Sequence, residues 1–292
     1  MNAITAGERE SGRNRIEGGT LYLVATPIGN LDDLSARALK VLEETDFIAA
    51  EDTRVTGKLL AHYGIRAECV SYHEHNKVQS GEEILRRLQS GESCALVTDA
   101  GTPGISDPGA DLCAACRKAG VRVTAVPGAC AFVTALILSG LDTRAFCFLG
   151  FLDSGDKKRR EEQLDTLVSC TMTAVLYEAP HRLRETPALL YEALGDREIV
   201  LCRELTKLNE EVRSFTLSEA AAYYRDREPR GEYVLVLKPS AKEDVFWKGM
   251  EVREHLAYYT DKLGMDKKTA MKQVARDRGM AKNEIYRILL DT

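Results

Sequence analysis

Short apolar runs alternate with longer segments of mixed polarity along most of the chain. In the first half, the runs at residues 21–25, 47–50, 94–98 and 121–126 predict strands, and segments with helical spacing of apolar positions follow them. The run 94–98 is apolar on both faces, which is typical of a strand inside a parallel sheet. This alternation predicts an α/β lobe over residues 20–126.

The second half of the chain repeats the alternation. It predicts strands at residues 145–149, 174–177, 199–202 and 233–237, and helices at residues 158–167, 180–194 and 218–227. Pro239 and Ser240 then interrupt the pattern, so we expect a second α/β lobe over residues 127–241 and a cleft between the two lobes.

Two further segments complete the expected organisation. Residues 242–292 predict a small helical appendage. Residues 1–19 are polar and predict a disordered tail, and they lack the apolar stretch of a signal peptide.

Local signals also predict where one helix begins and ends. Asp107 followed by Pro108 has the chemistry of an N-cap and a first-turn proline, and Gly120 is typical of a helix end. Within this helix, Cys113 and Cys116 form a C-x-x-C pair. One such pair cannot complete a tetrahedral zinc site, so core packing is favoured over a redox or metal role.

Charge is distributed unevenly along the 292 residues, although the net charge is only −5. Residues 248–292 hold 10 Lys/Arg and 7 Asp/Glu, so the other 247 residues hold 30 against 38. A basic appendage on an acidic body suggests a contact with an anionic partner. The eight cysteines are scattered, several within apolar runs, which indicates reduced thiols in a cytosolic protein.

Three glycine-containing loops, at residues 26–30, 99–107 and 127–129, each follow a predicted strand. Ligands of open α/β sheets bind at the carboxyl ends of strands, and glycine lets the backbone approach them closely. The loops contain no lysine and no phosphate-binding glycine motif. S-adenosylmethionine, with its adenine, amino acid and sulfonium, therefore fits better than a nucleoside triphosphate, although composition alone leaves this open.

Distinctive motifs stand in order along residues 20–240. They are LYLVATPIGNLDDLSARAL, AEDTR (50–54), SYHEHN (71–76), LVTDAGTPGISDPG (96–109), VPGA (126–129), YEAPHR (177–182), RELTK (203–207) and GEYVLV (231–236). Together they resemble the ribosomal RNA small subunit methyltransferase I family, within the tetrapyrrole-methylase fold superfamily. The resemblance implies a cytoplasmic homodimer, not associated with a membrane. Such an enzyme would use S-adenosylmethionine, and no metal, to 2′-O-methylate a cytidine of 16S rRNA, either as free RNA or in the small ribosomal subunit.

The resemblance also implies a cofactor site built from both lobes. Thr102 stands where many relatives have Asp, so a carboxylate is missing near the ligand and the contact there would be through backbone. The implied cofactor residues are Pro27, Gly29, Gly101, Thr102, Pro103, Ile105, Ser106, Pro127, Gly128, Ala129, Tyr177, Glu178, Gly231, Glu232 and Tyr233.

Methylation of a 2′-hydroxyl also requires that its proton be removed, which a general base assists. His73 is the first candidate because the reference pKa of histidine is ~6.5, and Asp52 and Glu178 come next. Each could instead make a structural hydrogen bond or salt bridge, and His73-Glu74-His75 is only a weak metal signal. The expected substrate contacts are Arg54, His75, Asn76 and Lys207.

Two basic segments have open interpretations. Residues 157–160 form either a solvated helix face or a surface that neutralises phosphates. Residues 267–288 have the pattern of a helix-turn-helix, with Ala275, Gly279 and Ile285 at its characteristic positions. This segment is either a small helical cap or an auxiliary contact with the RNA backbone.

Two other functions compete with RNA methylation. The first is a porphyrinoid C-methyltransferase of the same fold, which would need a cleft for a polycarboxylate macrocycle. The second is a helix-turn-helix DNA-binding regulator that senses S-adenosylmethionine, which only the basic tail supports.

Overall fold

The computed structural model describes residues 15–240, 247 and 249–290. The chain divides into two compact units. The larger unit contains Met1–Leu167 and Met172–Lys238, and the C-terminal unit contains Val168–Thr171 and Pro239–Thr292.

The first sheet of the larger unit has five parallel strands in the order β3-β2-β4-β1-β5. All of the strands predicted in the first half are confirmed, but β3 was missed because three residues are too few for a periodicity. Since the strands are parallel, all five carboxyl ends lie at one edge. The strands are β1 (Thr20–Val24), β2 (Phe47–Ala50), β3 (Cys69–Ser71), β4 (Cys94–Val97) and β5 (Arg122–Val126).

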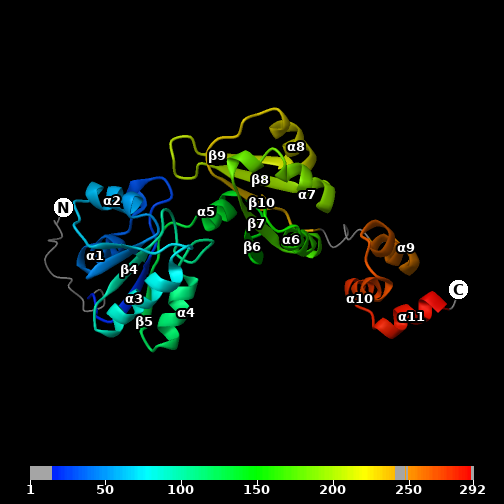
Figure 1. The fold of residues 1–292 in the computed structure, drawn as a ribbon. Helices are drawn as coiled ribbons and strands as arrows, with labels where there is room; N and C mark the ends of the chain where they lie inside the picture. The colour runs from blue at the N-terminus through cyan, green and yellow to red at the C-terminus, as the bar shows by residue number, and fades with distance from the viewer. Residues whose placement is uncertain (1–14, 241–246, 248, 291–292) are drawn as a thin grey trace, which may run out of the picture. The chain divides into compact units, whose positions relative to one another are not determined.

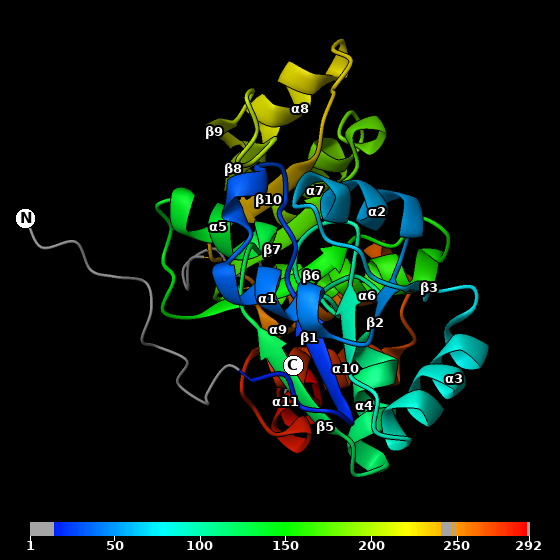
Figure 2. The same ribbon diagram turned by 90° about the vertical axis from the view of Figure 1, so that its left-hand side faces the viewer.

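Helices cover both faces of the first sheet (Figure 2). On one face, α1 (Ala36–Glu44) and α2 (Thr53–His62) bury Leu42 and Leu60 in a shared core. On the other face, α3 (Lys77–Gln89) and α4 (Ala110–Lys118) bury Leu88, Leu112 and Cys116. The buried position of Cys116 agrees with the packing role expected for the C-x-x-C pair.

The second sheet is mixed, in the order β6-β7-β10-β8-β9. Only β6 and β7 are parallel, and the other neighbours are antiparallel. The strand β9 lies in a polar sequence and was not predicted. The strands are β6 (Phe146–Phe151), β7 (Thr173–Glu178), β8 (Glu198–Arg203), β9 (Glu211–Thr216) and β10 (Tyr233–Leu237).

Helix α5 (Ala131–Leu138) packs on one face of the second sheet, against Val175, Val200 and Val234 (Figure 1). The other helices of this lobe are α6 (Lys157–Ser169), α7 (Thr186–Leu194) and α8 (Leu217–Arg225). The helix predicted over residues 180–194 is interrupted: Pro180–Arg182 form a separate 3-10 turn before α7.

The helix expected to have Asp107 as its N-cap begins two residues later. Its N-cap is Gly109, whose φ of 138° is accessible to glycine, and Pro108 O accepts a hydrogen bond from Gly104 N at 3.2 Å. Pro108 therefore closes a turn instead of starting the helix. This corrects the N-cap assignment and leaves the Asp107 carboxylate available for another role.

The C-terminal unit is a small helical bundle. It contains α9 (Val252–Ala257), a π-helical turn η4 (Tyr258–Lys262), α10 (Lys267–Asp277) and α11 (Lys282–Leu290), which share one core. A short turn with Gly279 at φ 62° joins α10 to α11. The local geometry agrees with the expected helix-turn-helix pattern, and Ala275 and Ile285 are buried in the core.

The expected segment boundaries remain predictions. Residues 1–14 of the expected tail and residue 241 lie outside the described residues. At the tail's end, Ile16 packs against the first core and Gly19 N donates to Gly91 O and Glu92 O. Within the described part of the chain, every helix is too short or too polar to cross a membrane.

Candidate active site

The three loops expected to hold the cofactor are bonded to one another at the carboxyl edge of the first sheet. Thr26 N donates to Gly101 O at 2.8 Å, and Gly101 N donates to Thr26 O at 3.1 Å. Thr26 Oγ1 also donates to Thr98 O at 3.2 Å, and Thr102 Oγ1 donates to Ala129 O at 3.0 Å. The loops after β1, β4 and β5 thus form one connected surface.

Glycine is required where these loops approach each other. Gly101 has a φ of 86°, and a Cβ there would lie 3.4 Å from Ile28 Cγ2. A Cβ on Gly128 would lie 3.0 Å from Ala25 Cβ. Pro127 and Gly128 are exposed at the edge, while Pro103 is buried beneath it. Pro27 and Ile105 are half-buried, so the loops present both backbone and apolar side chains at this edge.

The second lobe meets these loops through Tyr177. Ile28 and Ala129 share a core cluster with Tyr177, and Tyr177 Oη accepts a hydrogen bond from Phe132 N at 3.3 Å. Burial raises the pKa of Tyr177 to about 12, so its hydroxyl is neutral at physiological pH. The structure therefore brings Tyr177 to the cofactor loops, as expected.

Glu178 and Tyr233 point to the other face of the second sheet. Side chains alternate along a strand, and Tyr233 pairs with Glu178 while Val234 pairs with Tyr177. Tyr177 and Val234 belong to the cluster around α5, whereas the ring of Tyr233 meets that of Tyr224 on α8 with centroids 6.1 Å apart. Only the backbone of these two residues can therefore serve a site on Tyr177's face.

The contacts of Glu178 are those of a structural carboxylate. It is 2% exposed, it accepts from Thr186 Oγ1 at 2.5 Å and Ala179 N at 2.9 Å, and Arg182 lies 3.5 Å away. All of these partners lie beside or after β7. This placement favours a structural role for the Glu178 side chain, and its expected part in catalysis stays a prediction.

Lys207 lies against the first cofactor loop, but its charge is already paired. Its Nζ is 2.9 Å from Glu204 Oε1 and 2.7 Å from Glu232 Oε2, and its stem occupies the position that a Cβ on Gly29 would need. Gly231 in turn lies directly against Glu204. These residues close the junction between the lobes, so Lys207 could contact substrate only by exchanging partners.

Asp52 and Arg54 form a forked pair with each other. Arg54 Nη2 lies 2.6 Å from Asp52 Oδ2, and Asp52 caps α2 by accepting from Arg54 N at 2.8 Å. These hydrogen bonds hold the pKa of Asp52 at about 2. A carboxylate so strongly stabilised in its charged form is a poor general base, so a structural role is favoured for Asp52.

The motif after β3 is organised by Asn76. Asn76 Oδ1 accepts from His73 N at 2.8 Å, and Asn76 Nδ2 donates to Ser71 O at 3.2 Å, which makes Asn76 a structural residue of this turn. His73 Nδ1 is buried without a hydrogen-bond partner in the described part of the chain. His75 is exposed, with its ring 5.9 Å from that of His73.

Three carboxylates that the sequence interpretation did not select lie at the same edge. Asp99 Oδ1 accepts from Asp52 N at 3.1 Å, and Glu51 Oε2 accepts from Asp99 N at 3.4 Å. Burial raises the pKa of both, and it raises the pKa of Asp107 to about 6, helped by the charges of Glu51 and Asp99. The signal was present for Glu51 and Asp99, which immediately follow predicted strands, whereas Asp107 stands at the far end of the loop after β4.

Burial is the main cause of the raised pKa of Tyr177, and the charge of Asp107 adds a small contribution. Asp107 stands next to a contact between the lobes, because a Cβ on Gly150 of β6 would lie 2.8 Å from Ser106 Oγ. Its neighbour Ser106 has a φ of 60°, a conformation that non-glycine residues rarely adopt. Such local strain concentrates at functional sites, and it points to the segment Ser106–Asp107 as part of one.

Metal ligands were not expected, and the described residues contain no group of three or more His, Cys, Asp or Glu side chains with suitable geometry. The pair His73 and His75 thus has no third ligand among the residues described here.

Comparisons with known proteins agree with this architecture. The sequence profile of the Tetrapyrrole (Corrin/Porphyrin) Methylases matches residues 20–221. Among solved structures, uroporphyrin-III-C-methyltransferase from Thermus thermophilus has a TM-score of 0.55 at 22% identity, covering 79% of this chain and 97% of that one. A cobalt precorrin-4 methyltransferase has a TM-score of 0.57 at 17% identity, covering 75% of this chain and 95% of that one. A Thermus thermophilus uroporphyrin-III C-methyltransferase, complexed with S-adenosyl homocysteine, has a TM-score of 0.54 at 19% identity, covering 75% and 97%.

Relatives of higher identity carry a more specific name. Proteins named ribosomal RNA small subunit methyltransferase I are 46% identical in Halalkalibacterium halodurans, covering 96% of this chain and 98% of the relative, and 46% identical in Bacillus subtilis, covering 92% and 93%. The protein of that name in Escherichia coli O157:H7 is 42% identical, covering 94% and 95%.

The two lobes and the loop edge between them define an S-adenosylmethionine-dependent methyltransferase with the tetrapyrrole-methylase fold. Within that class, the chain belongs to the ribosomal RNA small subunit methyltransferase I family.

Proposed function

We propose that this enzyme transfers a methyl group to the ribose 2′-oxygen of a cytidine in 16S rRNA. The observation that carries the proposal is that a half-buried carboxylate, Asp107, lies within the connected cofactor loops and next to Ser106, which meets Gly150 of the second lobe. The names of the relatives identify ribosomal RNA of the small subunit as the substrate class. This substrate also favours the cytoplasmic location expected from the sequence, since ribosomal subunits are modified there.

The loops fit a donor of the size and chemistry of S-adenosylmethionine. Gly128 is exposed at the edge, so its backbone is accessible to a ligand. Gly101 is buried beneath it with a φ of 86°, which a larger residue could adopt only with strain. Gly29, Gly101–Ser106 and Pro127–Ala129 would hold the donor from the first lobe, and Tyr177 from the second. When bound, S-adenosylmethionine supplies an electrophilic methyl group on a sulfonium.

Asp107 is the general base in this proposal. Its pKa of about 6 leaves it ionised at neutral pH yet more basic than an ordinary carboxylate, as proton abstraction from a hydroxyl requires. The Asp107 carboxylate would accept the 2′-hydroxyl proton while the ribose oxygen bonds to the methyl carbon, the bond between that carbon and the sulfonium sulfur breaks, and S-adenosylhomocysteine leaves. Positioning of the hydroxyl by the two lobes supplies much of the remaining acceleration.

His73 remains the alternative base. Its buried Nδ1 lacks a partner among the described residues, and the charge of His73 acts on Glu51 within the acidic group. We favour Asp107 because its neighbour Ser106 meets Gly150 of the second lobe, which places Asp107 at the junction of the lobes. Of the expected substrate contacts, exposed Arg54 and His75 would meet RNA, whereas Asn76 would shape the loop and Lys207 the lobe junction.

The C-terminal unit serves RNA affinity in this proposal. Lys268 and Lys272 are exposed on α10, and basic side chains that bind phosphates make affinity fall with salt. The double variant Lys268→Glu and Lys272→Glu should weaken binding to small subunits and flatten the salt dependence. The variant Lys118→Glu, on exposed α4, is the matched control. Equal salt slopes in the two proteins would show that the unit is only a helical cap.

The proposed enzyme is a homodimer. Helix α5 is apolar around its whole circumference, and it exposes 44% of Val133, 65% of Ile137 and 44% of Leu138. A helix that is hydrophobic all round is normally buried, so a second copy would cover this face. Sedimentation should show a dimer for the natural chain and a monomer for Ile137→Lys.

The decisive experiment is transfer of a labelled methyl group to unmodified small subunits, naked 16S rRNA, uroporphyrinogen and DNA. Mass spectrometry of the digested RNA should locate the label on a cytidine ribose. Label on a base, or on uroporphyrinogen, would overturn the proposal and favour the porphyrinoid enzyme that shares this fold.

A further inference from the structure

The edge strand β6 contains a bulge that changes the direction of its last side chain. Phe148 pairs with Val175, but Gly150 pairs with Leu176, so Leu149 is an extra residue without a partner in β7. In an unbroken register, Phe151 would lie opposite Glu178 and point to the structural face of the sheet. The bulge places it opposite Tyr177 instead, and the two rings lie 5.5 Å apart.

The bulge also brings the lobes together. Gly150 has a φ of 63°, and a Cβ there would lie 2.8 Å from Ser106 Oγ of the first lobe. Ser106 has the strained φ of 60° noted above. Two unusual backbone conformations therefore meet at this point, and each permits the close approach of the other.

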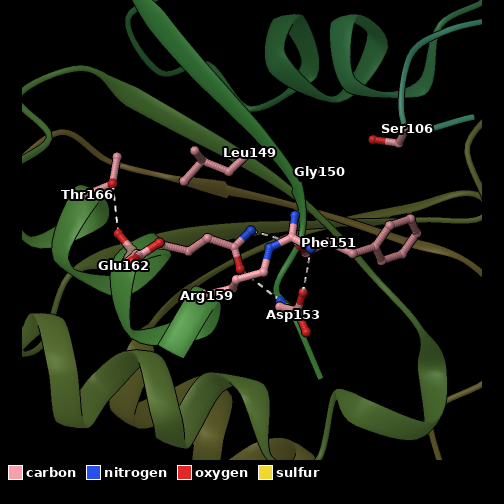
Figure 3. A pocket seen from close by; sticks show the side chains of 9 residues that line it. Ser106, Leu149, Gly150, Phe151, Asp153, Arg159, Glu162 and Thr166 are labelled. Atoms are coloured by element: carbon pink, nitrogen blue, oxygen red, sulfur yellow. Dashed lines mark hydrogen bonds and ion pairs between the residues drawn. The ribbon is translucent and has the colours of Figure 1, made fainter. Parts of the chain in front are cut away.

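Beside this contact the structure has a pocket of about 430 Å³. The pocket is lined by Ser106 on one side and by the β6 bulge and α6 on the other (Figure 3). Its volume lies in the range of ~300–1,000 Å³ usual for small-molecule sites. Phe151 contributes an aromatic ring that is 48% exposed, an unusual exposure for phenylalanine beside a packed core.

The polar wall of the pocket is held in place by backbone contacts. Gln163 accepts from Asp153 N at 2.8 Å and donates to Phe151 O at 3.0 Å. Asp153 Oδ1 accepts from Asp156 N at 2.7 Å. Arg159 is 73% exposed and reaches Asp153 at 3.6 Å, so its guanidinium is available to a ligand.

The N-terminal turn of α6 is basic, against the usual preference. Residues 157–160 are Lys-Lys-Arg-Arg, and no acidic residue stands in this first turn. Positive side chains are unfavourable at the positive end of a helix dipole. The N–H groups of this turn are already capped by Asp156, whose Oδ1 accepts from Lys158 N at 2.9 Å and from Arg159 N at 3.2 Å, so an anion would be held by the basic side chains and not by the helix N-terminus. Residues 157–160 were expected to form either a solvated helix face or a surface that neutralises phosphates. The pocket beside them favours the second interpretation.

We propose that the pocket between the β6 bulge and α6 receives the base of the target nucleotide, stacked on Phe151, with Arg159 contacting the base or its phosphate. The proposal rests on the proposed function and names where the RNA substrate binds. RNA-modifying proteins commonly bind bases turned out of a helix by stacking them on aromatic side chains. Stacking of the nucleobase on Phe151 would hold the attached ribose beside Ser106. The 2′-hydroxyl would then lie close to Asp107, the proposed general base.

The test compares Phe151→Leu, Phe151→Tyr and Arg159→Gln in the full chain, with unmodified small subunits as substrate. Phe151→Leu should lower kcat/KM for subunits by roughly 10- to 100-fold, the loss usual for one stacking aromatic. Phe151→Tyr should restore most of it. Calorimetric affinity for S-adenosylmethionine should stay within about twofold in every variant. Arg159→Gln should raise the KM and reduce its salt dependence.

Phe146→Leu is the matched control, since Phe146 lies on the same strand with a similar exposure of 41% and outside the pocket. If Phe151→Leu behaves like Phe146→Leu, the pocket does not bind the base. If Phe151→Leu loses affinity for S-adenosylmethionine instead, the pocket belongs to the donor site and the proposal is overturned. The natural enzyme is assayed first. If it does not methylate small subunits, the proposed function is wrong, and the proposal that the pocket binds the nucleobase is overturned with it.

Discussion

In the first sheet all five strands run parallel, whereas in the second only β6 and β7 do. The parallel sheet brings the end of every strand to one edge, so residues far apart in sequence, such as Thr26, Asp99 and Ala129, meet there. Within a strand of the second sheet, as in any strand, successive side chains point to opposite faces, with Tyr177 on one side and Glu178 on the other. Residues in loops after parallel strands thus meet at one edge of the sheet. Residues within a strand share a face only with every second neighbour.

The carboxylates of the two regions also lie in different environments. At the edge of the first sheet, Asp107 is half-buried with acidic neighbours, and burial raises its pKa to about 6. On the second sheet, the Glu178 carboxylate is almost fully buried, and its oxygens accept hydrogen bonds from Thr186 and Ala179. The first arrangement suits proton transfer and the second suits stability. Four predictions follow from this difference.

The largest expected effect is that of Asp107→Asn on methyl transfer. Loss of a positioned general base should lower kcat by about 10²- to 10⁴-fold, while affinity for S-adenosylmethionine remains nearly unchanged. Single-turnover transfer to small subunits measures the chemical step directly. His73→Gln is the comparator, and a larger loss in that variant than in Asp107→Asn would assign the base to His73.

Glu178→Ala should affect stability instead. Removal of this buried carboxylate leaves Thr186 Oγ1 and Ala179 N without their acceptor, which should cost about 2–4 kcal/mol of unfolding free energy. Urea denaturation measures this loss. The control is Glu198→Ala, which removes an exposed pair with Lys238 and should cost less than about 1 kcal/mol. A strongly reduced kcat in folded Glu178→Ala would show that Glu178 takes part in catalysis.

Asp107→Asn should also raise the melting temperature in a pH-dependent way. The folded-state pKa of Asp107 is raised to about 6 from an unfolded value near 3.8, so ionisation in the folded state opposes folding. This penalty is absent below pH 3.8, grows between pH 4 and 6, and is complete above pH 6. The variant should therefore melt roughly 2–4 °C higher at pH 8, and no higher at pH 3.5. A gain that does not depend on pH would have another cause.

The smallest effect is expected for Asp52→Asn. With a pKa of about 2, Asp52 is already a poor base, and asparagine caps helices as well as aspartate does. Turnover should change less than about threefold, and thermal melting should show a loss below about 1 kcal/mol. A hundredfold loss of turnover would make the Asp52–Arg54 pair part of the catalytic group.

The location of the site was predictable from the order of strands and loops. Apolar runs identified four of the five strands of the first sheet. Glycine-containing loops follow three of them, and the carboxyl-edge rule then placed these loops together. The three-residue strand β3 was missed because its pattern is too short, and β9 because an edge strand with polar residues resembles a loop. The structure places Thr102 and Tyr177 beside the loops to which the motifs assigned them, and their roles there stay predictions.

The choice among chemically similar side chains depended on tertiary structure. Asp52, Asp107 and Glu178 are all carboxylates near strand ends, and composition or spacing cannot rank them as bases. Their environments do: Asp52 is bonded to Arg54, Glu178 is buried on the wrong face, and Asp107 is desolvated beside other acids. A pKa depends on burial and on neighbouring charges, and both are properties of the folded chain.

The sequence by itself determined the class of fold, the family and the edge at which the cofactor loops meet, because periodicity, glycine and motif order are local properties of the chain. Only the tertiary structure decided which face each strand residue presents. The single extra residue Leu149 turns Phe151 from the face of Glu178 to that of Tyr177. That register results from pairing between β6 and β7, which are held together by contacts distant in sequence.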